Sequence, residues 1–211
     1  MSPDLCAQYD ASVGVTREAL TWLEGQGLVR AHARQGHIVT PLSREDLEDL
    51  TQTRMAIEPI VLRLSIEHRD LEWESGIVAA HHTMKRTYKL LHEETPDAAE
   101  RADQLEKWST VHANFHDALF RACPLQRLMA IARMLSEEAS LYRRWSDSLV
   151  SSRDVLAEHL DLMDAALAGD ADLASSLLTD HIARTAKGLI TFTDGDSPPP
   201  RRRGRRGGSP G

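Results

Sequence analysis

Long apolar runs and a leader sequence are both missing from this chain. No run of apolar residues reaches the roughly 18 positions that a membrane-spanning helix needs. The N-terminus MSPDLCAQYD lacks the basic and then apolar pattern of a secretory signal. We therefore expect a soluble, cytoplasmic protein with no membrane segment.

Cysteine, aromatic residues and glycine are also scarce. The two cysteines, Cys6 and Cys123, are far apart and belong to no metal or redox motif, so no disulfide framework is indicated. Aromatic residues make up 5% of the chain and only 12 of its 211 residues are glycine, which argues against an all-β fold. With 41% apolar residues, the chain can form one large domain or two small ones around a hydrophobic core.

Positive charge is scarce outside the C-terminal end. Five of the 25 lysine and arginine residues lie in the last eleven positions, so the rest of the chain carries 20 basic and 32 acidic side chains, a net charge of −12. This balance excludes a broad basic face for non-specific nucleic-acid binding.

The sequence from Ser43 to about Phe192 has the pattern of a helical bundle. It is rich in Ala, Leu, Glu and Arg, and its apolar residues recur at steps of three and four. Boundaries are indicated by SREDL at Ser43, by Pro96, by Pro124 and by AGDAD at Ala168. We predict a mainly α protein with a six-helix antiparallel bundle in a domain over 43–193. The predicted helices span about 43–69, 71–94, 96–122, 125–148, 152–168 and 170–192.

The first 42 residues predict a separate small head. TREALTWLEGQG indicates a helix from Thr16 to Gly27, and LVRAHARQGHIVTP alternates as two strands around a turn at Gln35 and Gly36. Upstream, DLCAQYDASVG supplies a short helix and a turn, so the Thr16 helix is the recognition helix of a partial winged helix-turn-helix. Because the segment holds only three arginines against four acids, a packing or dimerisation module is the alternative.

The C-terminal residues 194–211 predict a disordered basic tail. The sequence TDGDSPPPRRRGRRGGSPG, which follows Phe192, has no apolar side chains to bury. Its arginines either contact DNA phosphates non-specifically or make no fixed contact.

Four of the ten histidines lie on stripes that we predict to be buried. His112 and His116 are one turn apart on one helix, His159 lies on the next helix but one, and His181 on the last. A buried imidazole without a partner costs about 1–3 kcal/mol, and one shared metal ion would satisfy all four. The alternative is four hydrogen-bonded core histidines. Four further histidines are interpreted as solvated: His32, His37, His81 and His82.

These segments together resemble the GntR superfamily of bacterial transcription regulators, in its FadR-like branch with a helical FCD domain. The resemblance rests on five segments in the order of that family: DLCAQYDASVGVTREALTWLEGQGLV, IVTPLSREDLEDL, TRMAIEPIVLRL, NFHDALFRAC and AEHLDLMDAALAGDADLASSLLTDHI. They span about residues 4 to 190. The resemblance implies a winged-helix DNA-binding head and a ligand-binding, dimerising FCD bundle.

The resemblance also implies how the head contacts operator DNA. Hydroxyl groups and backbone amides would hold phosphates while Arg17 reads a base edge. The implied contacts are Ser12, Thr16, Arg17, Arg34 and Gln35. Where the family has an arginine ahead of the recognition helix this chain has Val13, and the family's additional helix ahead of Asp4 is not in the sequence. We expect either an earlier start or a truncated head.

FCD domains often hold a divalent metal, and the resemblance implies the same here. His116, His159 and His181 match the family's three histidine ligands, and His112 stands where the family usually has Asp or Asn. A neutral set of four imidazoles favours Zn²⁺ or Ni²⁺ over Mg²⁺ or Ca²⁺, which prefer oxygen.

The implied effector is a small organic acid. Arg54 matches an arginine that points into the ligand cavity of many FCD proteins, and Arg143 or Arg144 could bind a second carboxylate oxygen. The alternative for Arg54 is an ion pair with Glu58 one turn on.

We therefore expect a ligand-responsive, DNA-binding repressor that reads a palindromic operator as a homodimer. The alternatives are a truncated sensor without DNA binding and a metal-dependent hydrolase. The hydrolase lacks a clear general base, because Glu158 points about 100° away from His159 on its helix.

Overall fold

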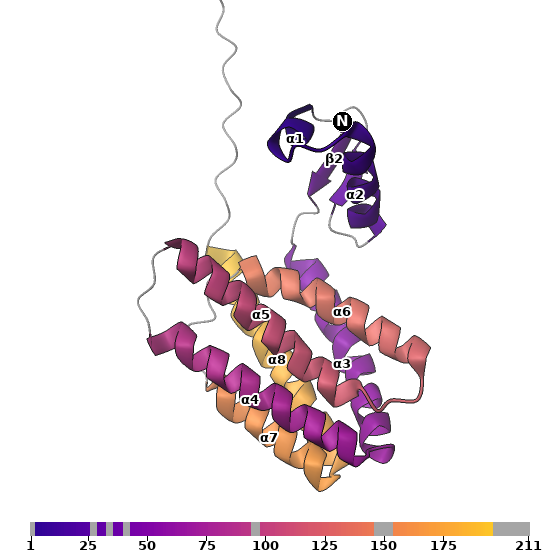
Figure 1. Ribbon diagram of the computed structural model, residues 1–211. Coiled ribbons are helices and arrows are strands. Elements are labelled where there is room, and N and C mark those ends of the chain that lie inside the picture. Colours follow the sequence, from indigo (N-terminus) through magenta and orange to yellow (C-terminus); the bar gives the residue numbers. More distant parts are fainter. Residues whose placement is uncertain are drawn as a thin grey trace, which may run out of the picture.

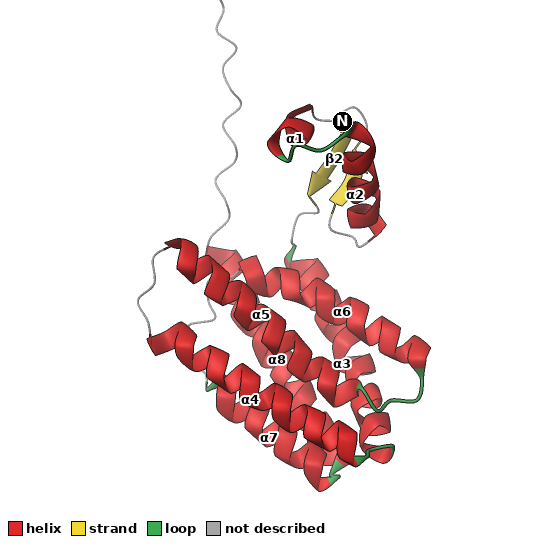
Figure 2. Ribbon diagram, viewed as in Figure 1, coloured by secondary structure: helices red, strands yellow, loops and turns green. Residues whose placement is uncertain are grey.

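The computed structural model describes residues 3–25, 29–32, 36–39, 43–93, 98–145 and 154–195. Within them lie a small head and a helical bundle (Figure 1). The head consists of α1 (Pro3–Gln8), α2 (Val13–Gly25), β1 (Val29–His32) and β2 (Gly36–Val39). The bundle consists of α3 (Arg44–Glu67), α4 (Leu71–Glu93), α5 (Ala98–Phe120), α6 (Gln126–Trp145), α7 (Val155–Ala168) and α8 (Ala171–Gly195). Figure 2 shows how completely helices dominate the fold, which confirms the mainly α prediction.

The head has the predicted order of helix, helix and hairpin. The strands β1 and β2 pair antiparallel, with Val29 opposite Val39 and His32 opposite Gly36. The helix α2 begins at Val13, so the predicted start at Thr16 was three residues too late. The reason is local, because the Ser12 Oγ accepts a hydrogen bond from the Val15 backbone N–H at 3.3 Å and caps the helix there.

The bundle helices follow the boundaries that the sequence indicates. The Ser43 Oγ accepts from the Asp46 N–H at 3.0 Å and caps α3, as SREDL predicts. At the AGDAD segment, Gly169 ends α7 with a left-handed φ of 77°, and Asp170 caps α8 by accepting from the Leu173 N–H at 3.0 Å. This short connection reverses the chain direction, so α8 packs alongside α7.

The main core lies between the bundle helices. Its buried side chains come from all six bundle helices, and include Leu62, Ile77, Phe115, Ala132 and Ile182. Burying each of the leucine, isoleucine and phenylalanine side chains stabilises the fold by about 1.5–3 kcal/mol. The helix α3 packs most extensively against α8, and α4 against α5. The core therefore joins segments from both halves of the chain.

A second, smaller core lies where α3 begins, after the head. It joins Leu47 and Leu50 of α3 to Leu135 and Tyr142 of α6 and to Leu189 of α8. The Tyr142 hydroxyl donates to Asp46 Oδ2 at 2.5 Å and ties the end of α6 to the first turn of α3.

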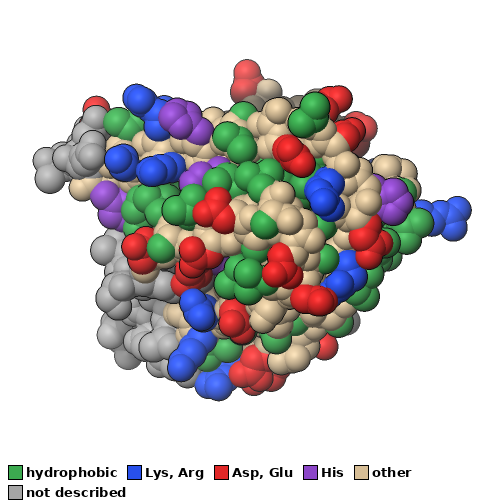
Figure 3. Space-filling view, turned by 90° about the horizontal axis from the view of Figure 1, so that it is seen from below, with side chains coloured by type: hydrophobic (Ala, Val, Ile, Leu, Met, Phe, Trp, Pro, Cys, Tyr) green, Lys and Arg blue, Asp and Glu red, His purple; other side chains and the backbone are tan. Residues whose placement is uncertain are grey.

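The surface of the bundle carries mixed charge. Acidic, basic and hydrophobic side chains are interspersed over the face drawn in Figure 3, which is the underside of the bundle as oriented in Figure 1. Within the described residues, no helix is both long enough and apolar enough to span a membrane. The predicted tail over 194–211 lies almost wholly outside the described residues, which end at Gly195.

Candidate metal centre

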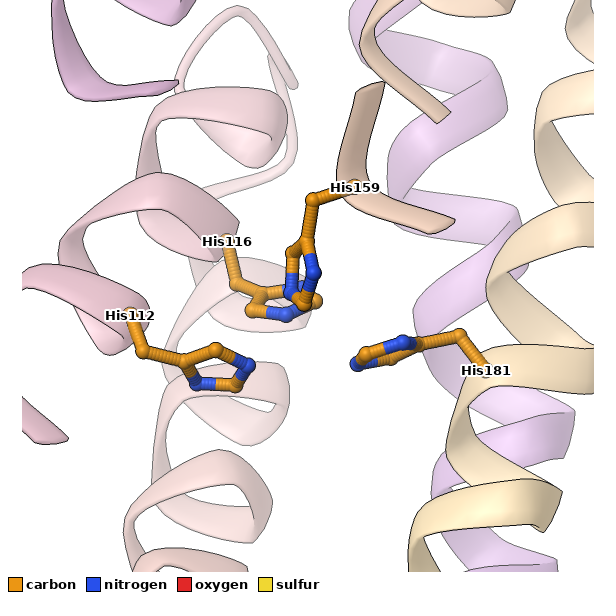
Figure 4. Close-up of side chains that lie close together, drawn as sticks. All are labelled: His112, His116, His159 and His181. Atoms are coloured by element: carbon orange, nitrogen blue, oxygen red, sulfur yellow. The ribbon is translucent and has the colours of Figure 1, made fainter. Parts of the chain in front are cut away.

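Four histidines from three helices meet inside the bundle. His112 and His116 project from successive turns of α5, His159 from α7 and His181 from α8, and their rings converge on one point (Figure 4). One ligand nitrogen of each ring lies within 4.8 Å of those of the others. The structure thus brings together all four of the histidines that the sequence places on buried stripes.

The cluster is closed to solvent. His159 is fully buried, and the other three rings are at most 7% exposed. The ring centroids of His159 and His181 are 4.6 Å apart, and those of His112 and His116 are 4.7 Å apart. Phe115 covers one side, with its ring centroid 5.6 Å from His116 and 5.3 Å from His159. Imidazoles this close and this dry must share either hydrogen bonds or an ion.

Hydrogen bonds outside the cluster orient two of the rings. The His159 Nδ1–H donates to the Val155 carbonyl at 2.6 Å, and the His181 Nδ1–H donates to Glu158 Oε2 at 3.1 Å. Because both acceptors are oxygens without a proton to give, each ring keeps its Nε2 lone pair for the cluster. Metal-ligating histidines are held in the same way by a carbonyl or carboxylate.

The residues present fit a metal ion. Both ring nitrogens of His116 are buried, and neither has a hydrogen-bond partner among the described residues. Burial is the largest cause that lowers the pKa of His112 and of His116 well below the ordinary value, followed by the neighbouring imidazoles. The rings of His112 and His116 are therefore neutral near pH 7, which is the form that binds a metal.

Two arginines approach the cluster from other helices. Arg54 of α3 and Arg143 of α6 are buried, and the positive charge of each further lowers the pKa of His116. Arg54 Nε lies 2.6 Å from Glu58 Oε1, and its Nη2 lies 3.1 Å from Glu58 Oε2. The alternative ion pair considered for Arg54 is thus present, but it is buried beside the histidines instead of exposed. The side chain of Arg144 lies outside the described residues.

The expected DNA contacts have different environments. Arg17 is exposed on the first turns of α2, and so is Ser12 just before them. Thr16 is buried, and its hydroxyl donates to the Ser12 carbonyl at 3.0 Å, so this side chain serves the helix start. Arg34 and Gln35 lie outside the described residues.

His81 corrects one interpretation of the sequence. It was interpreted as solvated but is 7% exposed, and its ring packs on Phe115 with centroids 5.8 Å apart. A signal was available, because Ile77, His81 and Met84 follow the three- and four-residue spacing of the buried face of α4. Its neighbour His82 is exposed, as expected.

Glu158 makes a contact with the histidine cluster that sequence reasoning missed. It points away from His159, as its place on the helix predicts, yet it reaches His181 on α8. Its second oxygen, Oε1, lies 3.4 Å from Arg184 Nη1. No local pattern predicts this pairing, because 23 positions separate Glu158 from His181.

Comparisons with known proteins identify the family of this chain. The FCD domain family matches residues 49–184. A relative in Paraburkholderia xenovorans (strain LB400), named "Uncharacterized HTH-type transcriptional regulator BphR", is 37% identical over 85% of this chain and 71% of its own length. The HTH-type transcriptional repressor GlaR of Escherichia coli (strain K12) is 30% identical over 84% of this chain and 80% of its own length.

A solved structure shares the fold. The crystal structure titled "a putative transcriptional regulator GntR from Rhodococcus sp. RHA1" superposes with a TM-score of 0.70, covering 90% of this chain and 86% of that one at 22% identity. The family match covers more than half of the chain, and the two sequence relatives are named as regulators of transcription. The chain belongs to the FCD-domain family of helix-turn-helix transcription regulators.

Proposed function

We propose that this regulator senses a small organic acid through a divalent metal held by His112, His116, His159 and His181. The observation that carries the proposal is the convergence of four buried imidazoles, of which His116 has no hydrogen-bond partner within the described part of the chain. When bound, the ion would act as a Lewis acid that holds an anionic group of the effector.

The donor set supports Zn²⁺ or Ni²⁺. All four ligands are nitrogens, and borderline ions prefer imidazole, whereas Mg²⁺ and Ca²⁺ prefer oxygen. Without a carboxylate among the four ligands, the ion keeps its full double charge. That charge strengthens the attraction for a carboxylate effector.

Arg54 and Arg143 support the choice of a carboxylate. Both guanidinium groups lie inside the bundle close enough to act on His116. A guanidinium group matches a carboxylate with two parallel hydrogen bonds. We propose that the effector bridges the ion and Arg143, and that Arg54, held by Glu58, contributes a second positive charge.

A path from this site to the head is available through α3. Arg54 lies on α3, the helix that follows the head, and Arg143 is adjacent to Tyr142, which donates to Asp46 in the first turn of α3. Binding that shifts α6 or α3 would therefore shift the start of α3. A change in head spacing then changes operator affinity.

The head supports binding to operator DNA. We propose that residues 1–42 form the DNA-binding domain and residues 43–193 the sensor, and that two copies pair around a two-fold axis to read two half-sites in the cytoplasm. The exposed Arg17 on α2 is the base-reading residue of this proposal. Repression that the effector relieves is the proposed sign, because the E. coli relative is named as a repressor.

Metal content tests the centre. Wild-type protein and the variants His116→Ala and His159→Ala are purified and analysed by inductively coupled plasma mass spectrometry, with the exposed His82→Ala as the matched control. We expect about one Zn or Ni per chain in wild type and control, and loss in both centre variants. No metal in wild type after reconstitution would leave four core histidines without an ion.

Electrophoretic shifts with the upstream DNA of the protein's own gene test the regulator. Metal-loaded protein is expected to form a complex that small carboxylates weaken, and Arg143→Gln is expected to keep the complex but lose that response. A complex that responds equally in the variant would remove Arg143 from the effector site. The absence of any ligand-sensitive complex would contradict the sensing proposal.

A further inference from the structure

We propose that Glu158 is a positioning residue of the candidate metal centre, which fixes the ring nitrogen that His181 offers and supplies a negative charge next to an otherwise neutral ligand set. The inference rests on the proposed metal site and adds a fifth residue to it. Glu158 contacts no ligand position itself, so it acts through His181.

Glu158 contacts His181 through the Nδ1 atom of the imidazole ring. Glu158 precedes His159 on α7, and its Oε2 lies 3.1 Å from His181 Nδ1 on α8. The Glu158 side chain is 15% exposed and that of His181 is 8% exposed, so water competes little for this bond. Two of the three helices that provide ligands, α7 and α8, are thereby joined through the carboxylate.

An ionised carboxylate accepts hydrogen bonds and donates none. The bond therefore requires the proton of neutral His181 to sit on Nδ1, which leaves the Nε2 lone pair directed at the cluster. His159 is oriented by the neutral carbonyl of Val155, at 2.6 Å. A charged acceptor raises the basicity of the imidazole bound to it more than a neutral acceptor does. His181 is therefore expected to donate its Nε2 electron pair to a metal ion more strongly than His159 does.

The charges around the centre give the carboxylate a second effect. Arg54 and Arg143 bring positive charge toward the histidines, and the carboxylate of Glu58 is bound to Arg54. Glu158 places a negative charge in direct contact with a ligand ring. A doubly charged ion in this dry site gains from that charge, because interactions are strong where water is excluded.

Arg184 provides a matched control. Its Nη1 lies 3.4 Å from Glu158 Oε1, and its side chain is 57% exposed. It touches the same carboxylate but no ring of the cluster. A merely structural bridge between α7 and α8 would be weakened by changes at either Glu158 or Arg184, whereas ring positioning depends on Glu158.

Zinc affinity, measured by competition with a chromogenic chelator, is the first test. We expect Glu158→Ala to bind Zn²⁺ about 10–100-fold more weakly than wild type, as for other residues that orient a metal-bound histidine. Glu158→Gln keeps an acceptor oxygen without the charge, so its Zn²⁺ affinity is expected to lie between those of wild type and Glu158→Ala. Arg184→Gln is expected to bind as wild type does. The visible spectrum of the Co²⁺-loaded proteins reports the same order through ligand geometry.

The protonated ring nitrogen in metal-free protein is the second test. Long-range ¹H–¹⁵N correlation spectra are expected to show His181 with its proton on Nδ1 in wild type and in Glu158→Gln, and to lose that preference in Glu158→Ala. The Gln variant also serves if the Ala variant does not fold. This measurement needs no metal, so it reads the positioning directly.

The outcomes separate the two proposals. Wild-type protein that binds no metal would overturn the proposed centre and this inference with it. Wild-type protein that binds Zn²⁺, together with Glu158 variants of equal affinity and unchanged His181 protonation, would overturn the inference alone. An equal loss of Zn²⁺ affinity in Glu158→Ala and Arg184→Gln would mean that Glu158 only bridges α7 and α8 and does not position His181.

Discussion

His112 determines the character of the candidate centre, because it provides nitrogen where the resemblance to FCD domains implies Asp or Asn. We expect His112→Asp to shift the preference from Zn²⁺ toward Mn²⁺ by about tenfold or more, ~1.4 kcal/mol, since a carboxylate oxygen suits a harder ion. Competitive binding of the two ions to wild type and variant measures the ratio. An unchanged ratio, with the exposed His82→Asp as control, would mean that His112 is not a ligand.

His81 makes the metal-free protein sensitive to acid. Burial is the first cause that lowers the pKa of His81 below its ordinary 6.5, and Lys85 and His82 lower it further while Asp164 opposes them. A folded-state pKa below the unfolded one means that the unfolded chain takes up the proton first. Stability from neutral His81 is therefore complete above pH 6.5 and falls as the pH drops below it.

Urea denaturation in EDTA at pH 7 and pH 5 checks this. His81→Gln is expected to lose less free energy of unfolding between the two pH values than wild type does. The reason is that the variant lacks an imidazole that takes up a proton more readily in the unfolded chain than in the folded protein. His112 and His116 keep part of the acid sensitivity, since their pKa values are lowered too. The matched His82→Gln is expected to follow wild type, and a His81 variant with the wild-type loss would contradict the argument.

Arg17 is the residue on which operator recognition depends in our proposal. Arg17→Ala is expected to weaken specific operator binding by ~1–3 kcal/mol, because an arginine that binds a guanine edge contributes about that much discrimination. Arg17→Lys keeps the charge but loses the paired donors, so it is expected to retain general DNA affinity while losing sequence preference. Fluorescence anisotropy with operator and scrambled duplexes measures both, and equal losses on the two duplexes would assign Arg17 to phosphate binding.

The turn between α7 and α8 brings two of the four histidines together, because His159 lies on α7 and His181 on α8. Gly169 has a φ of 77°, and a Cβ there would lie 2.8 Å from Arg69 Nη2. We expect Gly169→Ala to destabilise the protein by about 1–3 kcal/mol, partly through the left-handed backbone and partly through the contact with Arg69. Chemical denaturation measures the change.

The double variant Arg69→Ala/Gly169→Ala separates the two causes. Removing the guanidinium group is expected to recover the part that comes from the contact, measured against Arg69→Ala alone. The remainder is the backbone strain. A Gly169→Ala protein as stable as wild type would mean that α7 and α8 can end and begin differently.

The bundle helices were predictable because their signals are local. Ser43, Asp154 and Asp170 cap helices within three residues of their own position, and such caps can be read along the chain. The start of α2 was wrong although Ser12 supplies a cap of the same kind, because its Val13-Gly14-Val15 sequence has weak helix propensity. Differences in helix propensity of this size decide where a helix begins, so a predicted helix start can be wrong by about one turn.

The candidate centre joins three helices, α5, α7 and α8. Because its ligands come together only in the folded bundle, metal binding should be coupled to folding. An ion that binds only the folded protein stabilises it by ~2.7 kcal/mol at a free concentration one hundred times the dissociation constant. Thermal unfolding with buffered Zn²⁺ and with EDTA measures this. The gain should be lost in His159→Ala and retained in His82→Ala, and an equal gain in both would indicate binding elsewhere.

Four histidines were assigned to buried stripes from their spacing alone, and the structure brings all four together. Spacing sufficed because an α-helix fixes which residues share a face, so His112, His116, His159 and His181 had to point inward once their helices were amphipathic. The six helices and the small head followed from the same local rules.

The surroundings of those rings could not be predicted from local patterns along the chain. Helix packing brings Glu158 to His181 across 23 positions, and it brings Arg54 and Arg143 toward His116 from two other helices. These contacts depend on how the helices pack against one another, to which core side chains along the whole chain contribute. Local patterns were therefore enough to predict the helices and their inward histidines, whereas the charges and hydrogen bonds around those rings follow from how the helices pack.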